Sequence, residues 1–287
     1  MKAFYRRARN LYQIYCKDFG FVRTMFSLRM LKIPFVLTNS LGISILARYD
    51  DENLKNKLKT SPNVFAHLKQ ISKILSEGNV VFDVGANVGM YSVWMSRCVG
   101  EHGCVYVFEP IRQTYFDLLT TIGINKCGNI KAFNMGFFNK NGKLTMNVFD
   151  KGYSGWSTVG EPIMYFKGEV RRPVSKEVVE MTTLDNFVER EGIDTIDFLK
   201  VDVEGAEEFV FQGASKLLQQ KRVKLIAFEI SKAPLDGVGS SANRVIKTLR
   251  DFGYYTYEYR EDSNGAALFE NPIEDTDLEY VNIYAKP

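Results

Sequence analysis

The stretch Val80–Ser92, VVFDVGANVGMYS, decides the fold of this chain. A short apolar run ends at Asp83, passes two glycines, Gly85 and Gly89, and opens into residues with helical spacing, which predicts a strand, a tight turn and a helix. Glycine has no Cβ, so the backbone of such a turn approaches a ligand closely. The first amides of the following helix face the same crevice. Two interpretations stay open at this point: a site for a nucleotide-like ligand, or a turn that serves packing alone.

The alternation of predicted strands and helices continues along the chain. Apolar strands without polar alternation are separated by stretches of helical spacing, a pattern typical of a parallel sheet covered by helices on both faces. Two alternating aromatic runs near residue 287 predict a β-hairpin that closes one edge of the sheet. We therefore expect an α/β fold. The expected strands are Val80–Val84, Val105–Glu109, Ile130–Asn134, Ile196–Val201 and Val223–Ile230, the helices are Val64–Leu75, Met90–Cys98, Arg112–Asn125, Ala206–Gln220 and Ala242–Phe252, and the hairpin pairs Tyr254–Tyr259 with Tyr280–Lys286.

The regular pattern divides the chain into two parts. Residues 1–60 are predicted to form a basic N-terminal extension, helical with one strand over Ile43–Arg48. Residues 61–287 are predicted to form one α/β domain, in which the insertion 137–182 interrupts the alternation.

The insertion contains the glycine-rich loop KGYSGWSTVG. An insertion of this length in a compact domain is more often functional than decorative, so we expect the loop to recognise a second ligand. Tyr153, Trp156 and Ser157 combine aromatic faces, which stack on sugar rings, with a short hydroxyl. The alternative for Trp156 is an anchor in the core.

Composition narrows the class of protein. Apolar residues make up 45% and charged residues 25% of the chain, an ordinary globular composition. A net charge of +3 is too small to argue for a nucleic-acid partner. The 4 cysteines form no Cys-x-x-Cys pair, which fits free thiols in a reducing, cytoplasmic compartment. We expect no metal site, because no His, Cys and Asp cluster has zinc spacing. We also expect no signal peptide or membrane span, because the most apolar stretch, 33–47, is short and broken.

The first 32 residues concentrate positive charge. They carry eight basic residues against the single acid Asp18, with aromatic residues interleaved. One interpretation is a basic amphipathic helix that contacts a membrane surface or a partner polyanion. The other is a solvated helix packed on the domain. The sequence predicts no particular oligomeric state.

Acidic residues follow the predicted strands. Glu109 ends the second strand, 20 residues beyond Gly89, where an acid is positioned to bond both hydroxyls of a ribose. Asp202 and Glu204 follow the strand Ile196–Val201, in FLKVDVEGAEEFVFQGA. Ligands of open α/β sheets bind at the carboxyl ends of the strands, so we expect these acids to share one crevice with the first turn. The spacing Asp-x-Gly-x-x-x-Gly lacks the Gly-x-Gly-x-x-Gly of dinucleotide sites and disfavours a nicotinamide cofactor.

Other titratable side chains are expected in structural roles. Glu207 and Glu208 stand in the first turn of a helix, where the helix dipole favours acids. His102 precedes the second strand, at the opposite edge from the crevice. His67, on the helix before the first strand, is expected to pack, with a role as general base as the alternative.

In their order and spacing these motifs resemble the FkbM family of S-adenosylmethionine-dependent methyltransferases. DVGANVG, VFEP, TTLDNF, LKVDVEGAE and the strand ending AFEIS carry the likeness, which covers about residues 80–231. The resemblance implies a Rossmann-like, class I methyltransferase fold: a seven-stranded, mostly parallel sheet with an antiparallel last strand. It also implies S-adenosylmethionine as cofactor and O-methylation of a hydroxyl on a sugar, glycoconjugate or polyketide-like acceptor.

The resemblance also assigns roles to residues. Asp202 and Glu204 should face the methyl-transfer centre, and either is a candidate general base. An acid-lined crevice attracts the cationic sulfonium, so Asp202 also counts as a cofactor contact. Glu109 should bind the ribose. The other implied cofactor contacts are Asp83, Gly85, Asn87 and Gly89 around the methionine part, and Asn134 and Gly136 beside the adenine.

The sequence therefore predicts an enzyme, an S-adenosylmethionine-dependent O-methyltransferase with a small-molecule or glycan acceptor. Two alternatives remain: a non-catalytic scaffold of the same fold that docks through its basic N-terminus, and an NAD-dependent oxidoreductase. The intact set of acids argues against the scaffold, because a decayed site would tolerate their loss.

Overall fold

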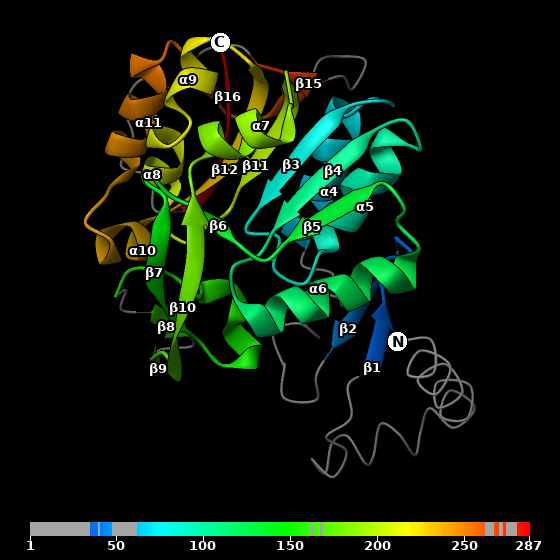
Figure 1. Ribbon diagram of the computed structural model, residues 1–287, viewed down its shortest axis with the longest axis vertical. Helices are drawn as coiled ribbons and strands as arrows, with labels where there is room; N and C mark the ends of the chain where they lie inside the picture. The colour runs from blue at the N-terminus through cyan, green and yellow to red at the C-terminus, as the bar shows by residue number, and fades with distance from the viewer. Residues whose placement is uncertain are drawn as a thin grey trace.

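The computed structural model describes residues 35–39, 41–47, 62–161, 164–166, 169–261, 267–269, 272–273 and 280–287. A central sheet runs through the molecule, with helices packed around it (Figure 1). The basic helix predicted for the first 32 residues lies outside the described ranges. Within these ranges, no helix is both long and apolar enough to cross a bilayer.

The central sheet has seven strands in the order β13-β16-β12-β11-β3-β4-β5. The strands from β12 to β5 pair in parallel, whereas β16 runs antiparallel to both of its neighbours. The predicted mostly parallel sheet and its closing antiparallel hairpin are thereby confirmed. The strands are β3 (Val80–Val84), β4 (Cys104–Phe108), β5 (Ile130–Phe133), β11 (Ile196–Val201), β12 (Val223–Ser231), β13 (Tyr255–Tyr257) and β16 (Tyr280–Lys286).

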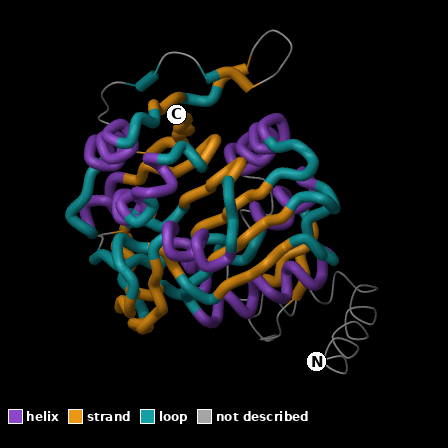
Figure 2. The backbone as a smooth tube through the Cα atoms, turned by 45° about the horizontal axis from the view of Figure 1, so that its top comes forward, coloured by secondary structure: helices purple, strands orange, loops and turns teal. Residues whose placement is uncertain are grey.

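Helices cover both faces of the sheet (Figure 2). Successive residues of each strand face opposite sides, so Val81 packs with Met95 and Leu118 on one face and Phe82 packs with Phe187 on the other. Helices α4 (Pro62–Ile74), α5 (Met90–Val99) and α6 (Arg112–Asn125) cover the first face. The second is covered by α7 (Leu184–Glu191), α8 (Glu207–Gln212), α9 (Ser215–Gln219) and α11 (Ala242–Asp251), and the short α10 (Lys232–Gly237) follows β12.

The order of the strands fixes where a ligand binds. The chain leaves β3 toward β4 and β5 on one side, and later returns to β11 on the other side of β3. The carboxyl ends of β3 and β11 therefore form the switch point at which open α/β sheets bind ligands.

One predicted helix is two helices. The sequence suggested a single helix over Ala206–Gln220, but α8 ends before Gly213 and α9 begins at Ser215. A Cβ on Gly213 would overlap the Phe138 carbonyl oxygen, and the Asp185 carboxylate caps α9 by accepting from the amides of Lys216 and Leu217 (2.9 and 3.0 Å). The close approach of another segment ended the helix, and a single-sequence pattern does not reveal such an approach.

The insertion builds a small sheet of its own beside the main one. Its three strands are ordered β6-β10-β7, with β10 antiparallel to β7. The sequence pattern predicts two of these strands, over Lys143–Asp150 and Val178–Thr182, which correspond to β7 and β10, whereas β6 was not predicted. The elements are β6 (Gly136–Phe137), β7 (Gly142–Val148), the 3-10 segment η1 (Lys151–Trp156), the hairpin β8 (Met164–Phe166) and β9 (Glu169–Arg171), and β10 (Ser175–Thr182).

Two short hairpins lie outside these layers. The strand predicted over Ile43–Arg48 is present as β2 (Ser44–Ala47), paired with β1 (Phe35–Thr38), which the sequence analysis missed. Asn125 at the end of α6 holds β2, because its side chain accepts from the Ser44 amide at 3.0 Å and donates to the Ser44 carbonyl. The second hairpin pairs β14 (Arg260–Glu261) with β15 (Ala267–Leu268).

Candidate active site

The turn between β3 and α5 packs directly against the backbone of neighbouring segments. The amides of Gly85 and Ala86 both donate to the carbonyl of Phe108, at 3.0 Å each. Gly85 has φ +81°, and a Cβ there would overlap the carbonyl oxygen of Asp202. Gly89 has φ +87°, and a Cβ there would meet the end of the Leu118 side chain. Both positions therefore favour glycine for conformation, and Gly85 requires it for space as well.

Glu109 holds this turn from the end of β4. One carboxylate oxygen accepts from the Asn87 amide at 3.0 Å and the other from the Ile111 amide at 2.9 Å. The side chain is buried. Burial raises the pKa of Glu109 to about 7, and the two amide hydrogen bonds oppose the rise. An ionised carboxylate has about four acceptor positions, so each oxygen keeps a lone pair for a further donor.

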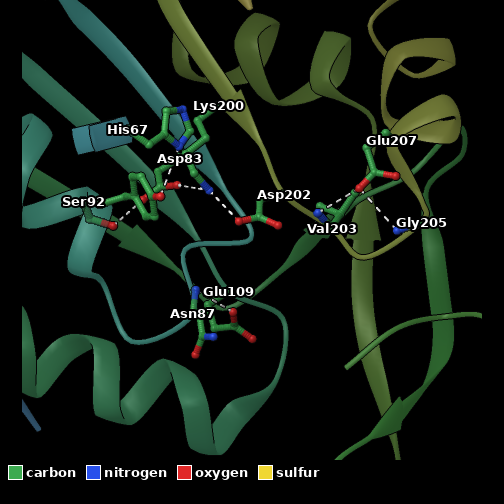
Figure 3. A network of polar contacts seen from close by, with 11 residues as sticks. His67, Asp83, Asn87, Ser92, Glu109, Lys200, Asp202, Val203, Gly205 and Glu207 are labelled. Atoms are coloured by element: carbon green, nitrogen blue, oxygen red, sulfur yellow. Dashed lines mark hydrogen bonds and ion pairs between the residues drawn. The ribbon is translucent and has the colours of Figure 1, made fainter. Parts of the chain in front are cut away.

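A buried lysine joins the two central strands. Lys200 on β11 lies opposite Asp83 in the strand register, and its Nζ is 2.9 Å from Asp202 Oδ2 and 3.6 Å from Asp83 Oδ1 (Figure 3). Nζ also lies 4.6 Å from the centre of the Tyr91 ring. Asp83 accepts a second hydrogen bond from Ser92 Oγ at 2.6 Å. We call Asp83, Lys200 and Asp202 the buried triad.

Burial disfavours the charged forms of the side chains in the buried triad, whereas their attraction for one another favours those forms. Burial raises the pKa of Asp83, while Lys200 and Ser92 pull it down. Burial lowers the pKa of Lys200, but Asp202 and Asp83 outweigh it, so the pKa of Lys200 ends above its ordinary value and the ammonium stays charged. Lys200 was not among the predicted site residues. The available signal was a lysine inside an otherwise apolar strand, FLKV, because a buried lysine is almost always paired.

The turn after β11 is built around Glu207. Glu204 has φ +51° and Gly205 φ +102°, and the Glu207 carboxylate accepts from the amides of Val203 and Gly205 at 3.2 and 3.3 Å (Figure 3). Burial raises the pKa of Glu207 to about 7, against the backbone hydrogen bonds it accepts. Glu207 and Glu208 stand in the first turn of α8, as predicted, but both are buried rather than solvated.

The insertion loop is bonded to both turns. Ser154 Oγ lies 3.4 Å from Asn87 Oδ1, and Thr158 Oγ1 donates to the Glu204 carbonyl at 2.7 Å. Tyr153 and Trp156 pack against each other with ring centres 4.5 Å apart. The Ser157 hydroxyl accepts from the Phe149 amide at 3.4 Å and so ties the loop to β7.

Two further predicted contacts lie beyond Glu109. Asn134 donates to the carbonyls of Glu109 and Pro110, at 2.9 Å each. Gly136 begins β6, and a Cβ there would meet the sulfur of Met181. Asn134 therefore fixes the path of the chain after β4, while Gly136 is buried within the small sheet.

The two histidines have different surroundings. His102 is exposed in the turn before β4. His67 on α4 is buried, with Nδ1 3.1 Å from the Tyr91 hydroxyl. Burial lowers the pKa of His67 to about 4, with a further lowering by Lys200 and an opposing effect from Asp202.

The fold is that of an α/β protein in which acidic side chains gather at the switch point of a parallel sheet. The model of the FkbM methyltransferase domain matches residues 83–255, more than half of the chain, and the chain belongs to this family. This confirms the resemblance found in the sequence and, with it, a methyltransferase domain that uses S-adenosylmethionine.

Known relatives are distant. A methyltransferase of Sordaria araneosa, sdnD, is 28% identical over 171 residues, which cover 52% of this chain and 65% of the relative. Methyltransferase 1 of Beauveria bassiana is 24% identical over 147 residues, 48% of this chain and 59% of the relative. The matches thus span less than two thirds of either relative. A solved S-adenosylmethionine-dependent methyltransferase from Aquifex aeolicus superposes with a TM-score of 0.43 at 17% identity, over 80% of this chain and 95% of that one.

The residues present fit the cofactor. The lone pairs of Glu109 suit the two hydroxyls of a ribose. The missing Cβ atoms of Gly85 and Gly89 let the turn pack on Asp202 and Leu118. The side chain of Asp202 keeps 31% of its surface exposed, so the acidic end of the buried triad reaches the crevice.

We expect Gly85→Ala to abolish measurable cofactor binding, because the new methyl group displaces the Asp202 carbonyl. Overpacking of this kind also costs about 1–3 kcal/mol of stability. Gly78→Ala is the matched control, since Gly78 has φ +84° but nothing within 4 Å of a Cβ. Calorimetry with S-adenosylmethionine and chemical unfolding measure both effects, and equal behaviour of the two variants would contradict the close approach.

Lys200→Met should destabilise the protein by about 3–5 kcal/mol, because the buried Asp83 carboxylate and the partly exposed Asp202 carboxylate lose their cation. Lys224→Met, which removes an exposed lysine paired with Asp197, should change stability by less than about 0.5 kcal/mol. Urea unfolding of both variants checks the difference.

The loss in Lys200→Met should grow with pH. The pKa of Asp83 is raised in the folded state, and removing Lys200 raises it further. An acid with a raised pKa favours the folded state at low pH and loses that contribution as the pH rises through the folded pKa. The variant should therefore lie closer to wild type at pH 5 than at pH 8, and an equal deficit at both would show that Asp83 does not respond to the lysine.

Glu109 should make cofactor binding depend on pH. With a pKa of about 7 it is largely neutral at pH 6 and ionised at pH 8, so affinity should rise between these values. Glu109→Gln should bind about 1–3 kcal/mol more weakly at pH 8 and show no such rise. Glu180→Gln, at an exposed ion pair with Lys143, serves as the control in the same calorimetric titration.

Proposed function

We propose that the protein transfers a methyl group from S-adenosylmethionine to a hydroxyl of a sugar, glycoconjugate or related small acceptor. The observation that carries this proposal is the insertion loop, which is hydrogen-bonded to both turns of the cofactor crevice while it presents a packed aromatic pair. An acceptor seated on that pair would lie beside the cofactor.

The aromatic pair suits a sugar-like ring. Tyr153 and Trp156 are half-buried, so part of their surface remains accessible. The apolar C–H face of a sugar ring packs well on such aromatic surfaces. The Arg171 guanidinium lies 5.1 Å from the centre of the Tyr153 ring, which adds a donor for an oxygen-rich or anionic group on the acceptor.

The protein groups of the crevice take complementary parts in this proposal. Glu109 binds the ribose, while Gly85, Asn87 and Gly89 shape the turn around the methionine part. Asp202 and Glu204 face the methyl-transfer centre, where their charge favours a cation. When bound, the cofactor supplies an electrophilic methyl group on a positively charged sulfur.

Positioning supplies much of the rate in such a transfer. The acceptor oxygen must stand about 3 Å from the methyl carbon and in line with the bond that breaks. The loop is held for this task at two points, Ser154 on the first turn and Thr158 on the second, so a bound acceptor would be fixed relative to both.

The direct test uses the full chain with methyl-labelled cofactor and a panel of methyl glycosides, disaccharides and lipid-linked sugars. We expect label in a hydroxyl of at least one acceptor, in step with release of S-adenosylhomocysteine. Binding of the cofactor without transfer to any hydroxyl would favour the scaffold alternative. Label on nitrogen or carbon would overturn O-methylation.

Trp156→Ala should raise the KM for the acceptor about tenfold or more and leave S-adenosylmethionine affinity unchanged, because the lost surface belongs to the acceptor side. Tyr255→Ala removes an exposed aromatic residue on the edge strand β13 and should change neither value. Steady-state kinetics and calorimetry separate the two constants. An equal loss of cofactor affinity in Trp156→Ala would make Trp156 a packing residue.

A further inference from the structure

A small polar cavity lies behind the buried triad, at the carboxyl ends of β11 and β12. Its volume is about 20 Å³, enough for one water-sized group. Helices α4 and α5 and strand β16 complete its walls. The polar side chains that line it are His67, Tyr91, Lys200, Asp202, Glu229 and Asn282.

His67 lines the cavity, and one of its ring nitrogens is available for a further hydrogen bond. Its side chain is 7% exposed, and Nδ1 is occupied by the Tyr91 hydroxyl at 3.1 Å. Within the part of the chain that the structure describes, Nε2 is buried and has no hydrogen-bond partner. A buried polar atom without a partner is costly, which points to a group that completes it.

We propose that this cavity receives the reacting hydroxyl of the methyl acceptor, and that Nε2 of His67 takes its proton. This inference rests on the O-methyltransferase function proposed above. A bond forms between the acceptor oxygen and the methyl carbon, the bond from that carbon to sulfur breaks, and its electron pair stays on sulfur. The hydroxyl proton passes to Nε2.

The geometry favours His67 over Asp202 as the base. Asp202 Oδ2 already accepts from the Lys200 ammonium at 2.9 Å, which makes it a poorer proton acceptor. His67 is uncharged at neutral pH, since its pKa is about 4. A weak base suffices, because the hydroxyl becomes strongly acidic as the oxygen bonds to carbon.

Tyr91 sets the tautomer that the role requires. If Nδ1 carries the hydrogen and donates it to the Tyr91 oxygen, Nε2 presents a lone pair to the cavity. The rings of Tyr91 and Tyr284 pack edge-on against the imidazole and hold its orientation. Tyr91 therefore acts as a positioning residue.

The first experiment reads His67 directly and needs no acceptor. The chain has 2 histidines, so nitrogen NMR of labelled imidazoles gives two resolved sets of signals, with exposed His102 as the internal control. We expect the Nδ1–H tautomer at His67. An analogue of S-adenosylhomocysteine with an amine at the methyl position should shift the His67 signals more than S-adenosylhomocysteine does and leave His102 unmoved. An Nε2–H tautomer, or equal shifts with both ligands, would overturn the proposal.

The second experiment reads catalysis with a methyl glycoside accepted by the wild-type protein. His67→Gln should lower kcat about 10²–10⁴-fold with unchanged cofactor affinity, whereas His102→Gln should match wild type. The wild-type kcat should decrease at low pH, where His67 becomes protonated. This decrease should be absent from the pH profile of His67→Gln. The groups that face His67 are Tyr91 from α5, Lys200 from β11, Asp202 just after β11, Glu229 from β12 and Tyr284 from β16. Burial and Lys200 lower its pKa, and Asp202 opposes them.

Chemical rescue separates catalysis from packing. His67→Ala leaves a space of imidazole size, and added imidazole should restore part of the rate without changing the unfolding temperature. Full activity in His67→Gln with an accepted sugar would refute the base and leave the O-methyltransferase function standing. A wild-type protein that methylates no hydroxyl would refute that function, and the NMR result would still report whether His67 faces the methyl position.

Discussion

The buried ammonium of Lys200 is the constraint on which the site depends. A lysine that is 4% exposed is tolerated only if its charge is paired. The parallel register of β3 and β11 supplies one partner by placing Asp83 beside it, and the end of β11 supplies the other, Asp202. Asp202 stays partly exposed, and its carboxylate suits a sulfonium cation. The same pairing joins the two strands at the switch point of the sheet.

The remaining acids of the crevice shape the backbone. Glu109 holds the turn after β3, and Glu207 holds the turn after β11, each by accepting two backbone amides. Because both carboxylates are buried where they hold these turns, their pKa values are raised to about 7. The two turns also touch each other, because Gly85 packs on the carbonyl of Asp202. A ligand that contacts one turn is therefore positioned relative to the other.

The sequence was most informative where local pattern and tertiary structure agree. Strands β3 and β11 and helix α6 follow from apolar runs, glycine turns and helical spacing, and the hairpin of β13 and β16 from alternating aromatic residues. Long-range contacts were not readable. The close approach of Phe138 to Gly213 divides one predicted helix into two. The pairing of Lys200 depends on β3, a strand far away in sequence. The hydrogen bond between Val80 and Asp197, which are 117 residues apart, joins the same two strands. The role of His67 depends on a cavity whose walls come from five separate elements.

The position of His67 in the chain separates two parts of the proposed chemistry. The family model covers residues 83–255, which include the glycine turn, Glu109 and Asp202, and so the groups assigned to the cofactor. His67 lies before that range, on α4, and lines one cavity together with Tyr91, Lys200 and Asp202. Cofactor binding and proton removal would thus be supplied by different segments of the chain.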